Sequence, residues 1–220
     1  DGPRRRGRRR LTPSGLEGGS ELAVDSLFRP RSSEALDHGT LVHAWFEQFE
    51  WLDDLPTDER LAEVAVERGL TLDDLDKRLV GFHQHLDHPE VRALFVPDTY
   101  ASPERLPFEQ SVRDRVEAGE VEFEVNNEYP FVVDEDGAVL RGTIDRLVLL
   151  TRGDEVLAAD TIDFKTDRVV DDEAIAERIE HYRAQLDAYR RAVGRLFGLA
   201  SDRIATRLVF LEPGLVVSVD

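Results

Sequence analysis

The spacing of apolar residues predicts that the part of the chain before residue 120 is mainly helical. Apolar positions recur every three or four residues there, which is the helical period. The expected helices span 38–52, 59–69, 72–86, 89–95 and 108–118. Thr40 follows Gly39 and is a typical helix N-cap, so we expect the first helix to begin there. Residues 97–107 are expected to form a loop, because prolines bound them at both ends.

From residue 121 onward the pattern changes to runs of β-branched and aromatic residues separated by turn signals. The expected strands span 121–133, 139–150, 156–164, 203–211 and 215–219. A turn-like insert around Gly153 makes the second and third of these a β-hairpin. Between the third and fourth strands, an apolar stripe at helical spacing predicts one long helix over 172–197, which Gly198 ends.

Three charged residues lie inside the central hairpin, which otherwise has the composition of buried strands. They are Asp145, Asp163 and Lys165. Charged side chains are almost never fully buried without a partner, and a divalent metal would neutralise two carboxylates. Side chains alternate along a strand, so Asp163 and Lys165 share a face. If the hairpin turns near Gly153, Asp145 lies close to diagonal from Asp163, and both carboxylates can reach one Mg²⁺ or Mn²⁺.

The lysine in this hairpin stands out against the composition of the chain. The sequence contains 26 Arg but only two Lys, Lys77 and Lys165. A chain that uses Arg by default and has Lys between Phe164 and Thr166 suggests that a compact ammonium is needed there. Such a group can stabilise charge on a phosphoryl transition state or orient a water molecule. The alternative is a solvated pair of Asp163 and Lys165 at a strand end, which contributes little.

Two residues outside the hairpin could add ligands to the same site. His43 lies on the first expected helix, with Glu47 one turn later and Glu50 three residues further on. It is either a metal ligand or a partly exposed histidine beside a glutamate. Glu128 lies at a strand start before Tyr129, and it either reaches the site or is a solvated charge at the sheet edge.

Two other groups of polar residues are candidates of lower specificity. Three histidines cluster in the sequence HQHLDH: His83, His85 and His88. Their spacing does not match a strong metal-binding motif, so we interpret them as surface residues. On the long helix, Gln185 and Tyr189 are four residues apart. A glutamine beside the apolar stripe either orients a catalytic group or a phosphate, or simply packs, and Tyr182 is interpreted as ordinary packing.

Composition limits the classes of function. The chain has no Cys, so disulfides, zinc–thiolate sites and iron–sulfur clusters within it are excluded. It has neither a long apolar run nor a signal-peptide pattern, which favours an intracellular location. Residues 1–35 have linker composition; they act as a nucleic-acid-contacting arm, a tether or a plain disordered linker. The chain starts without Met, so we expect it to be an excerpt of a longer protein.

The net charge is −18 and is unevenly distributed. Residues 1–10 contain six Arg and one Asp, whereas the remaining 210 residues contain 22 basic and 45 acidic side chains. A body with a net charge of −23 repels a polyanion at long range, which argues against a free-standing general DNA-binding protein. It leaves room for a nuclease domain to which other, basic domains hand the substrate.

Four motifs occur together in a definite order. They are Gly39-Thr40-Leu41-Val42-His43, Gly142-Thr143-Ile144-Asp145-Arg146, Ile162-Asp163-Phe164-Lys165-Thr166 and Tyr182-x-x-Gln185-x-x-x-Tyr189. In this order the chain resembles the RecB-like branch of the PD-(D/E)XK nuclease family, most closely the C-terminal nuclease domain of AddA-type helicase–nucleases. The resemblance covers residues 36–220. It implies an α/β fold with a restriction-endonuclease-like core, in which a mixed β-sheet is flanked by helices and preceded by a helical portion.

The resemblance also implies a role for each matching residue. The implied metal ligands are His43, Asp145, Asp163 and the backbone carbonyl of Phe164. Lys165 would be the catalytic lysine, and Gln185 with Tyr189 would support the site and contact DNA. The implied activity is a Mg²⁺- or Mn²⁺-dependent deoxyribonuclease, an exonuclease acting on single strands in double-strand-break repair and recombination.

The same resemblance implies partners. We expect DNA, helicase domains upstream in the same polypeptide and an AddB-type partner subunit, with the protein in the cytoplasm at the nucleoid. No Walker A glycine motif lies in these residues, so the ATPase would have to lie outside them. Two alternatives remain open: a non-catalytic nuclease-like module that binds DNA or a partner subunit, and a different metal-dependent phosphodiesterase or restriction-type endonuclease.

Overall fold

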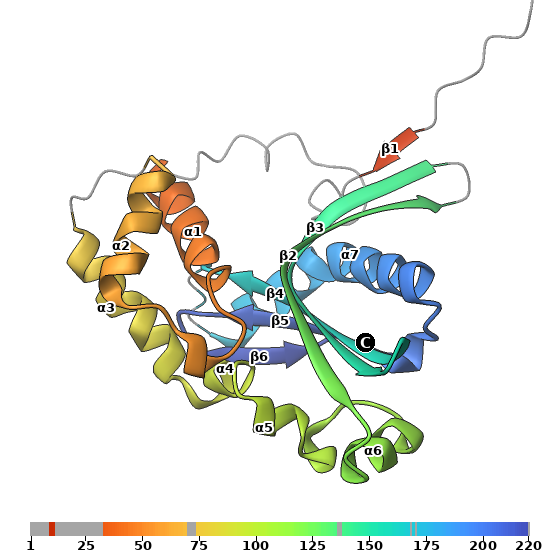
Figure 1. Ribbon diagram of the computed structural model, residues 1–220. Helices are drawn as coiled ribbons and strands as arrows, with labels where there is room; N and C mark the ends of the chain where they lie inside the picture. Colours follow the sequence, from red (N-terminus) through yellow and green to blue (C-terminus); the bar gives the residue numbers. More distant parts are fainter. Residues whose placement is uncertain are drawn as a thin grey trace, which may run out of the picture.

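The computed structural model describes residues 9–11, 33–69, 74–135, 138–167, 169 and 171–219. These residues form one mixed β-sheet with helices packed on both of its faces (Figure 1). After the short strand at residues 9–11, the part up to residue 117 is helical, and the other strands follow from residue 122 onward. The expected architecture of a mixed sheet flanked by helices is therefore confirmed.

The sheet has six strands in its described part. They are β1 Arg9–Leu11, β2 Glu122–Glu135, β3 Ala138–Arg152, β4 Glu155–Lys165, β5 Ile204–Phe210 and β6 Leu215–Ser218. Along the path β1-β3-β4-β5-β6, the pairs β1–β3 and β4–β5 are parallel and the other two are antiparallel. Strand β2 pairs antiparallel with β3. The β3–β4 hairpin turns at Gly153, as predicted, and this glycine has a φ of 58°.

Helices cover the two faces of the sheet unequally. On one face lie α1 Ser33–Phe46, α2 Asp58–Glu67, α3 Leu75–Asp87, α4 Pro89–Ala93, α5 Pro97–Tyr100 and α6 Gln110–Glu117. The long helix α7, Asp172–Phe197, packs on the other face and makes the crossover between the parallel strands β4 and β5 (Figure 1). Its bounds are those predicted from its apolar stripe, and Gly198 follows it with a φ of 67°.

The alternation of side chains along β3 and β4 places apolar groups in two separate cores. Val148 and Ile162 belong to the core under the N-terminal helices, whereas Leu147 and Ala159 belong to the core under α7. A strand buried on both faces needs apolar residues at nearly every position, which explains the continuous apolar runs of the hairpin. Charged residues in the middle of these strands, such as Arg146, Asp160 and Asp163, are therefore buried.

The first helix begins earlier than the sequence analysis predicted. Helix α1 starts at Ser33, so Thr40 lies inside the helix and is not its N-cap. Gly39, taken as a boundary signal, instead allows close packing: a Cβ at this position would lie 3.2 Å from Oγ1 of Thr166, the residue after β4. Gly39 therefore reflects the close approach of α1 to the end of β4.

Two other segments also differ from prediction. Residues 97–107 are not a plain loop, because they contain α5 and the 3₁₀ turn Pro103–Arg105; each of these begins with proline, whose fixed φ suits a first turn. Arg9–Leu11, within the expected 1–35 linker, pair with β3 as a short strand. Residues 1–8 and 12–32 of that linker lie outside the described residues. No helix within the described part is long and apolar enough to cross a membrane.

Candidate active site

The candidate site lies where the ladder of β3 is interrupted on both sides. Pairing with β4 ends at Arg146, opposite Ile162. Pairing with β2 joins Asn127 to Arg146 and resumes two residues further on, so Glu128 and Asp145 between these pairs are not joined in the ladder. Glu128 also has a φ of 50°, which is uncommon for a residue other than glycine. The irregular backbone frees both acidic side chains from the regular alternation of the sheet.

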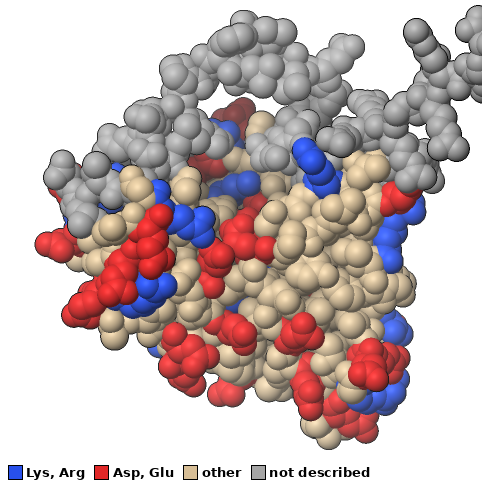
Figure 2. Space-filling model, turned by 45° about the horizontal axis from the view of Figure 1, so that its top comes forward, with Lys and Arg blue, Asp and Glu red and all other residues tan. Residues whose placement is uncertain are grey.

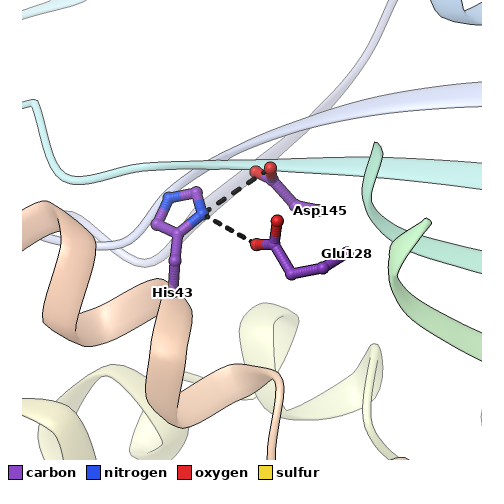
Figure 3. A group of neighbouring side chains, drawn as sticks. All are labelled: His43, Glu128 and Asp145. Atoms are coloured by element: carbon purple, nitrogen blue, oxygen red, sulfur yellow. Dashed lines mark ion pairs between the residues drawn. The ribbon is translucent and has the colours of Figure 1, made fainter. Parts of the chain in front are cut away.

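His43 from helix α1 meets these two carboxylates (Figure 3). Its Nδ1 lies 3.7 Å from Oε1 of Glu128 and 3.6 Å from Oδ1 of Asp145. One ligand atom from each of the three side chains falls within 4.8 Å of the others, and this is the only such group among the described residues. The structure therefore places His43 and Asp145 together, as expected, and resolves the alternatives for Glu128 in favour of the site.

The electrostatics of this group favour a protonated histidine when no metal is bound. Burial lowers the pKa of His43, but the carboxylates of Asp145 and Glu128 outweigh burial and raise this pKa to about 11. Burial raises the pKa of Asp145, but the charge and hydrogen bond of His43, the Lys165 ammonium and the Phe164 amide together lower it by more, so the net shift of this pKa is downward. Asp145 Oδ2 also accepts a 2.8 Å hydrogen bond from the Phe164 amide, which stabilises the ionised carboxylate.

The second predicted pair, Asp163 and Lys165, lies on the side of the sheet facing α7. Lys165 Nζ is 2.9 Å from Oδ2 of Asp163 and donates a 3.2 Å hydrogen bond to the Gln185 side chain. Gln185 donates in turn to Oδ1 of Asp163 and to the Tyr189 hydroxyl, at 3.2 and 2.8 Å. Asp163 is 1% exposed, so the pair is buried rather than a solvated strand-end contact.

Burial controls the charges of this pair. It raises the pKa of Asp163 to about 6, although the nearby Lys165 ammonium opposes the shift. Burial lowers the pKa of Lys165, but Asp163, Tyr182 and Asp145 together outweigh burial, and the net shift of this pKa is upward. The lysine is therefore held as a cation beside a carboxyl that is costly to ionise.

Tyr182 has a contact that the sequence analysis missed. The Lys165 ammonium lies 4.0 Å from the centre of the Tyr182 ring, and the tyrosine hydroxyl donates a 2.6 Å hydrogen bond to Asp167. The ring is buried, as ordinary packing would require, but it also faces the lysine charge. Its position one turn before Gln185 on α7 is the sequence signal that could have indicated this role.

Except for Tyr189, these groups line one pocket of about 730 Å³. Its wall includes the predicted residues His43, Asp145, Asp163, Phe164, Lys165 and Gln185, together with Glu128, Asp167 and Tyr182. Glu47 also lines it, but pairs with Arg68 at 2.5 Å rather than with the acidic group around His43. Tyr189 supports the wall from behind through its bond to Gln185.

The donors in this pocket fit a divalent cation. His43, Glu128 and Asp145 offer one nitrogen and carboxylate oxygens, a mixture that Mg²⁺ accepts through oxygen and Mn²⁺ accepts through both elements. Asp163 Oδ2 is buried and accepts no hydrogen bond from the described part of the chain, with only the Lys165 ammonium beside it. The Phe164 carbonyl accepts a 3.1 Å hydrogen bond from His43 Nε2, so the two predicted ligands touch each other here.

The histidine cluster behaves differently from its interpretation as a surface group. His85 is only 6% exposed and donates a 3.0 Å hydrogen bond to the Leu211 carbonyl. The interpretation is therefore wrong for His85, because α3 turns this residue toward the end of β5. His83 pairs with Asp58 at 2.7 Å on the surface, as predicted. Neither residue belongs to the group around His43.

Comparison with known proteins agrees with the order of the motifs. The family model described as the PD-(D/E)XK nuclease superfamily matches residues 21–217, which is most of the chain. No curated protein matches the sequence. The match includes the hairpin with Asp145, Asp163 and Lys165, and the helix with Gln185. The chain belongs to the PD-(D/E)XK nuclease superfamily.

Proposed function

We propose that the protein is a metal-dependent deoxyribonuclease that hydrolyses phosphodiester bonds. The observation that carries this proposal is the meeting of two groups in one pocket: the carboxylates around His43, and the buried pair of Asp163 and Lys165. The first group has the donors that a divalent ion requires, and the second holds a permanent cation beside it. Membership of a nuclease superfamily agrees with this chemistry.

Within this proposal, His43, Asp145 and Asp163 hold the ion, with the Phe164 carbonyl as a further ligand. The closeness of Glu128 to His43 and Asp145 supports adding Glu128 to this proposed set. A bound Mg²⁺ or Mn²⁺ supplies Lewis acidity toward a phosphate oxygen and toward water. Because its acidic neighbours raise the pKa of His43 to about 11, this ring would have to lose a proton before it could hold an ion.

The remaining side chains act on charge and position. Lys165 is held as a cation and stabilises the negative charge that develops on the phosphoryl oxygens during hydrolysis. Gln185 contacts both Lys165 and Asp163 and therefore fixes the distance between the ammonium and the carboxylate. Tyr189 holds Gln185 in turn. Such preorganisation favours catalysis because little rearrangement is needed in the transition state.

We further propose that the substrate is single-stranded DNA, degraded from an end after helicase domains of the same polypeptide unwind it. The resemblance to AddA-type helicase–nucleases supports this, together with an AddB-type partner and a role at the nucleoid in double-strand-break repair. In this arrangement 1–35 is the linker and 36–220 the nuclease domain. The described body is acidic, and Figure 2 shows basic groups scattered among acidic ones, which agrees with substrate delivery by other domains.

A cleavage assay tests this proposal. Linear and circular single-stranded DNA are incubated with the protein at low salt, with Mg²⁺ or Mn²⁺ and with EDTA. Lys165→Ala removes the catalytic cation, and Lys77→Ala, at the other lysine, exposed on α3, is the matched control. The proposal predicts cleavage of linear DNA that EDTA and Lys165→Ala abolish and Lys77→Ala preserves.

Other outcomes identify the alternatives. Cleavage of closed circles would favour an endonuclease of the restriction type. DNA binding without any cleavage, in the presence of metal and of the linked helicase, would favour the non-catalytic module. The full set of His43, Asp145, Asp163 and Lys165 argues against that module, because buried charges without a function are costly to keep.

A further inference from the structure

Asn127 and Arg146 stand directly opposite each other on β2 and β3, one position away from the site. They form the last regular pair before the break in the ladder, and the next residues on each strand are Glu128 and Asp145. Neither Asn127 nor Arg146 lines the pocket. Both turn instead toward the segment that follows α1, the helix that carries His43.

Arg146 is fully buried, with 0% exposure, and contacts this segment directly. Its guanidinium donates hydrogen bonds to the carbonyls of Glu50, at 2.6 Å, and Leu94, at 3.3 Å. It also lies 5.3 Å from the centre of the Trp51 ring and 4.5 Å from that of Phe95. Burial lowers the pKa of Arg146 to about 10, so the side chain still carries its charge at neutral pH.

Asn127 joins Arg146 to the end of α1. It accepts a 3.1 Å hydrogen bond from Arg146 and donates to the carbonyls of Phe46, at 3.3 Å, and Phe49, at 2.8 Å. Phe46 is the last residue of α1. The other carbonyls of the final turn already accept bonds from Glu47 and Gln48. Asn127 therefore supplies the missing partner of a helix C-terminus.

The chemistry of this contact indicates that Asn127 and Arg146 position the backbone they contact and do not only stabilise the fold. A buried arginine is expensive when, like Arg146 among the described residues, it forms no direct ion pair, and apolar residues often fill such sites at no cost in stability. A planar guanidinium and an amide can, however, fix the positions of several carbonyls at once. Three of these carbonyls, those of Phe46, Phe49 and Glu50, lie between the end of α1 and Trp51, and their bonds tie this segment to the strands that carry the acidic residues.

We infer that Asn127 and Arg146 are positioning residues that lock the end of α1, and hence His43, against Glu128 and Asp145. The inference rests on the proposed function for its consequence, which is that metal affinity depends on this lock. Ligands held by such supporting contacts typically lose about 10–100-fold in metal affinity when the contacts are removed. The lock itself is a property of the fold and can be measured without metal.

Asn127→Ala tests the inference, with Asn126→Ala as a matched control on the same strand. Asn126 bonds to the exposed Glu124 and not to α1. Val193→Ala, in the core under α7, is a second control for general loss of stability. Hydrogen exchange is measured at the amides of Glu47 and Gln48 without metal, and Mn²⁺ affinity is measured by calorimetry well below the melting temperature.

We expect Asn127→Ala to raise exchange at these two amides about tenfold and to weaken Mn²⁺ binding about 10–100-fold. Both controls should change Mn²⁺ affinity by less than about twofold. Equal exchange rates at these amides in Asn127→Ala and Asn126→Ala would show that Asn127 does not hold the end of α1, whatever the Mn²⁺ affinities are. Equal loss of Mn²⁺ affinity in Val193→Ala would reduce the effect to general destabilisation and overturn the positioning role.

Two further outcomes are also decisive. If the wild-type protein binds no Mn²⁺, the proposed function fails, and the exchange measurement alone decides whether the lock exists. If Asn127→Ala does not fold, Asn127→Ser takes its place in both measurements, because serine is polar and changes the side-chain volume less. The two claims therefore fail by different observations.

Discussion

The ammonium of Lys165 lies 4.0 Å from the centre of the Tyr182 ring, so α7 faces the proposed catalytic lysine with an aromatic surface. The ring attracts the cation without competing for its hydrogen-bonding protons. Asp167 accepts a hydrogen bond from the Tyr182 hydroxyl and thereby holds the ring in place from its far end. Tyr182 is therefore part of the environment of the lysine as well as of the core.

Substitutions at Tyr182 should distinguish the effect of the ring on kcat from the effect of the hydroxyl. Tyr182→Phe keeps the ring beside Lys165, so we expect kcat to stay within about threefold of wild type. Tyr182→Leu removes the attraction, worth about 1–2 kcal/mol at a desolvated site, so kcat should fall about tenfold. Single-turnover cleavage measures both. Equal losses in the two variants would assign the effect to the hydroxyl and Asp167 instead of the ring.

Asp163→Asn should abolish cleavage without unfolding the protein. The carboxyl is buried, which raises its pKa to about 6, so its ionisation costs more free energy in the folded protein than in the unfolded chain. The substitution removes this unfavourable charge but leaves Lys165 beside Gln185. We expect the melting temperature without metal to be equal to or higher than that of wild type. A variant that loses its fold would show that Asp163 is a structural residue.

Arg68 should contribute to substrate binding rather than to the chemical step. It lines the pocket, and its 2.5 Å pair with Glu47 is exposed, so a phosphate can compete for it at little cost. We expect Arg68→Gln to raise KM about tenfold with little change in kcat. Arg60→Gln is the matched control, because Arg60 lies on α2 with similar exposure, pairs with Glu63 and Glu67, and does not line the pocket. Identical KM values for the two variants would contradict this role.

His85 should make the protein sensitive to acid. Burial lowers its pKa below the ordinary value of 6.5, so below pH 6.5 the unfolded chain takes up a proton that the folded protein excludes. The contribution of neutral His85 to the free energy of unfolding is therefore fully present above pH 6.5. It is lost as the pH falls from there toward the lower pKa of the folded state. The slope is at most about 1.4 kcal/mol per pH unit.

Asn can replace His85 as a donor to the Leu211 carbonyl without titrating. We expect denaturant unfolding between pH 7 and 5 to show a smaller loss of stability in His85→Asn than in wild type. His83→Asn, at a surface histidine on the same helix, serves as the control. An identical pH dependence in His85→Asn and wild type would show that other groups control acid stability in this range.

The sequence was sufficient to predict the elements and residues that follow a regular period. Helix α7 and the central hairpin have continuous apolar patterns, and Asp163 and Lys165 break the pattern of β4 at two visible positions. The charge of these residues in an apolar strand is a physical anomaly that one sequence reveals. The order of the four motifs then identified the family.

The residues that the sequence did not place depend on irregular backbone or on distant contacts. Glu128 reaches the site because its φ is 50° and the ladder breaks there, and no residue pattern reports either feature. Gly39 and Thr40 suggested a helix boundary because close packing of α1 on the residue after β4 also selects glycine. In the sequence Arg146 stands out only as part of the second motif, because its burial beside Trp51 and Phe95 depends on the tertiary structure.

The central claim is that a divalent ion binds where the ladder of β3 breaks, and calorimetric titration of Mn²⁺ tests it most directly. The proteins compared are wild type, Asp145→Asn, Glu128→Gln and Glu124→Gln, the last being an exposed control on the same strand as Glu128. We predict that wild type and Glu124→Gln bind Mn²⁺ alike, and that Asp145→Asn and Glu128→Gln bind it about tenfold or more weakly. No binding by wild type, or equal binding by all four proteins, would contradict the account.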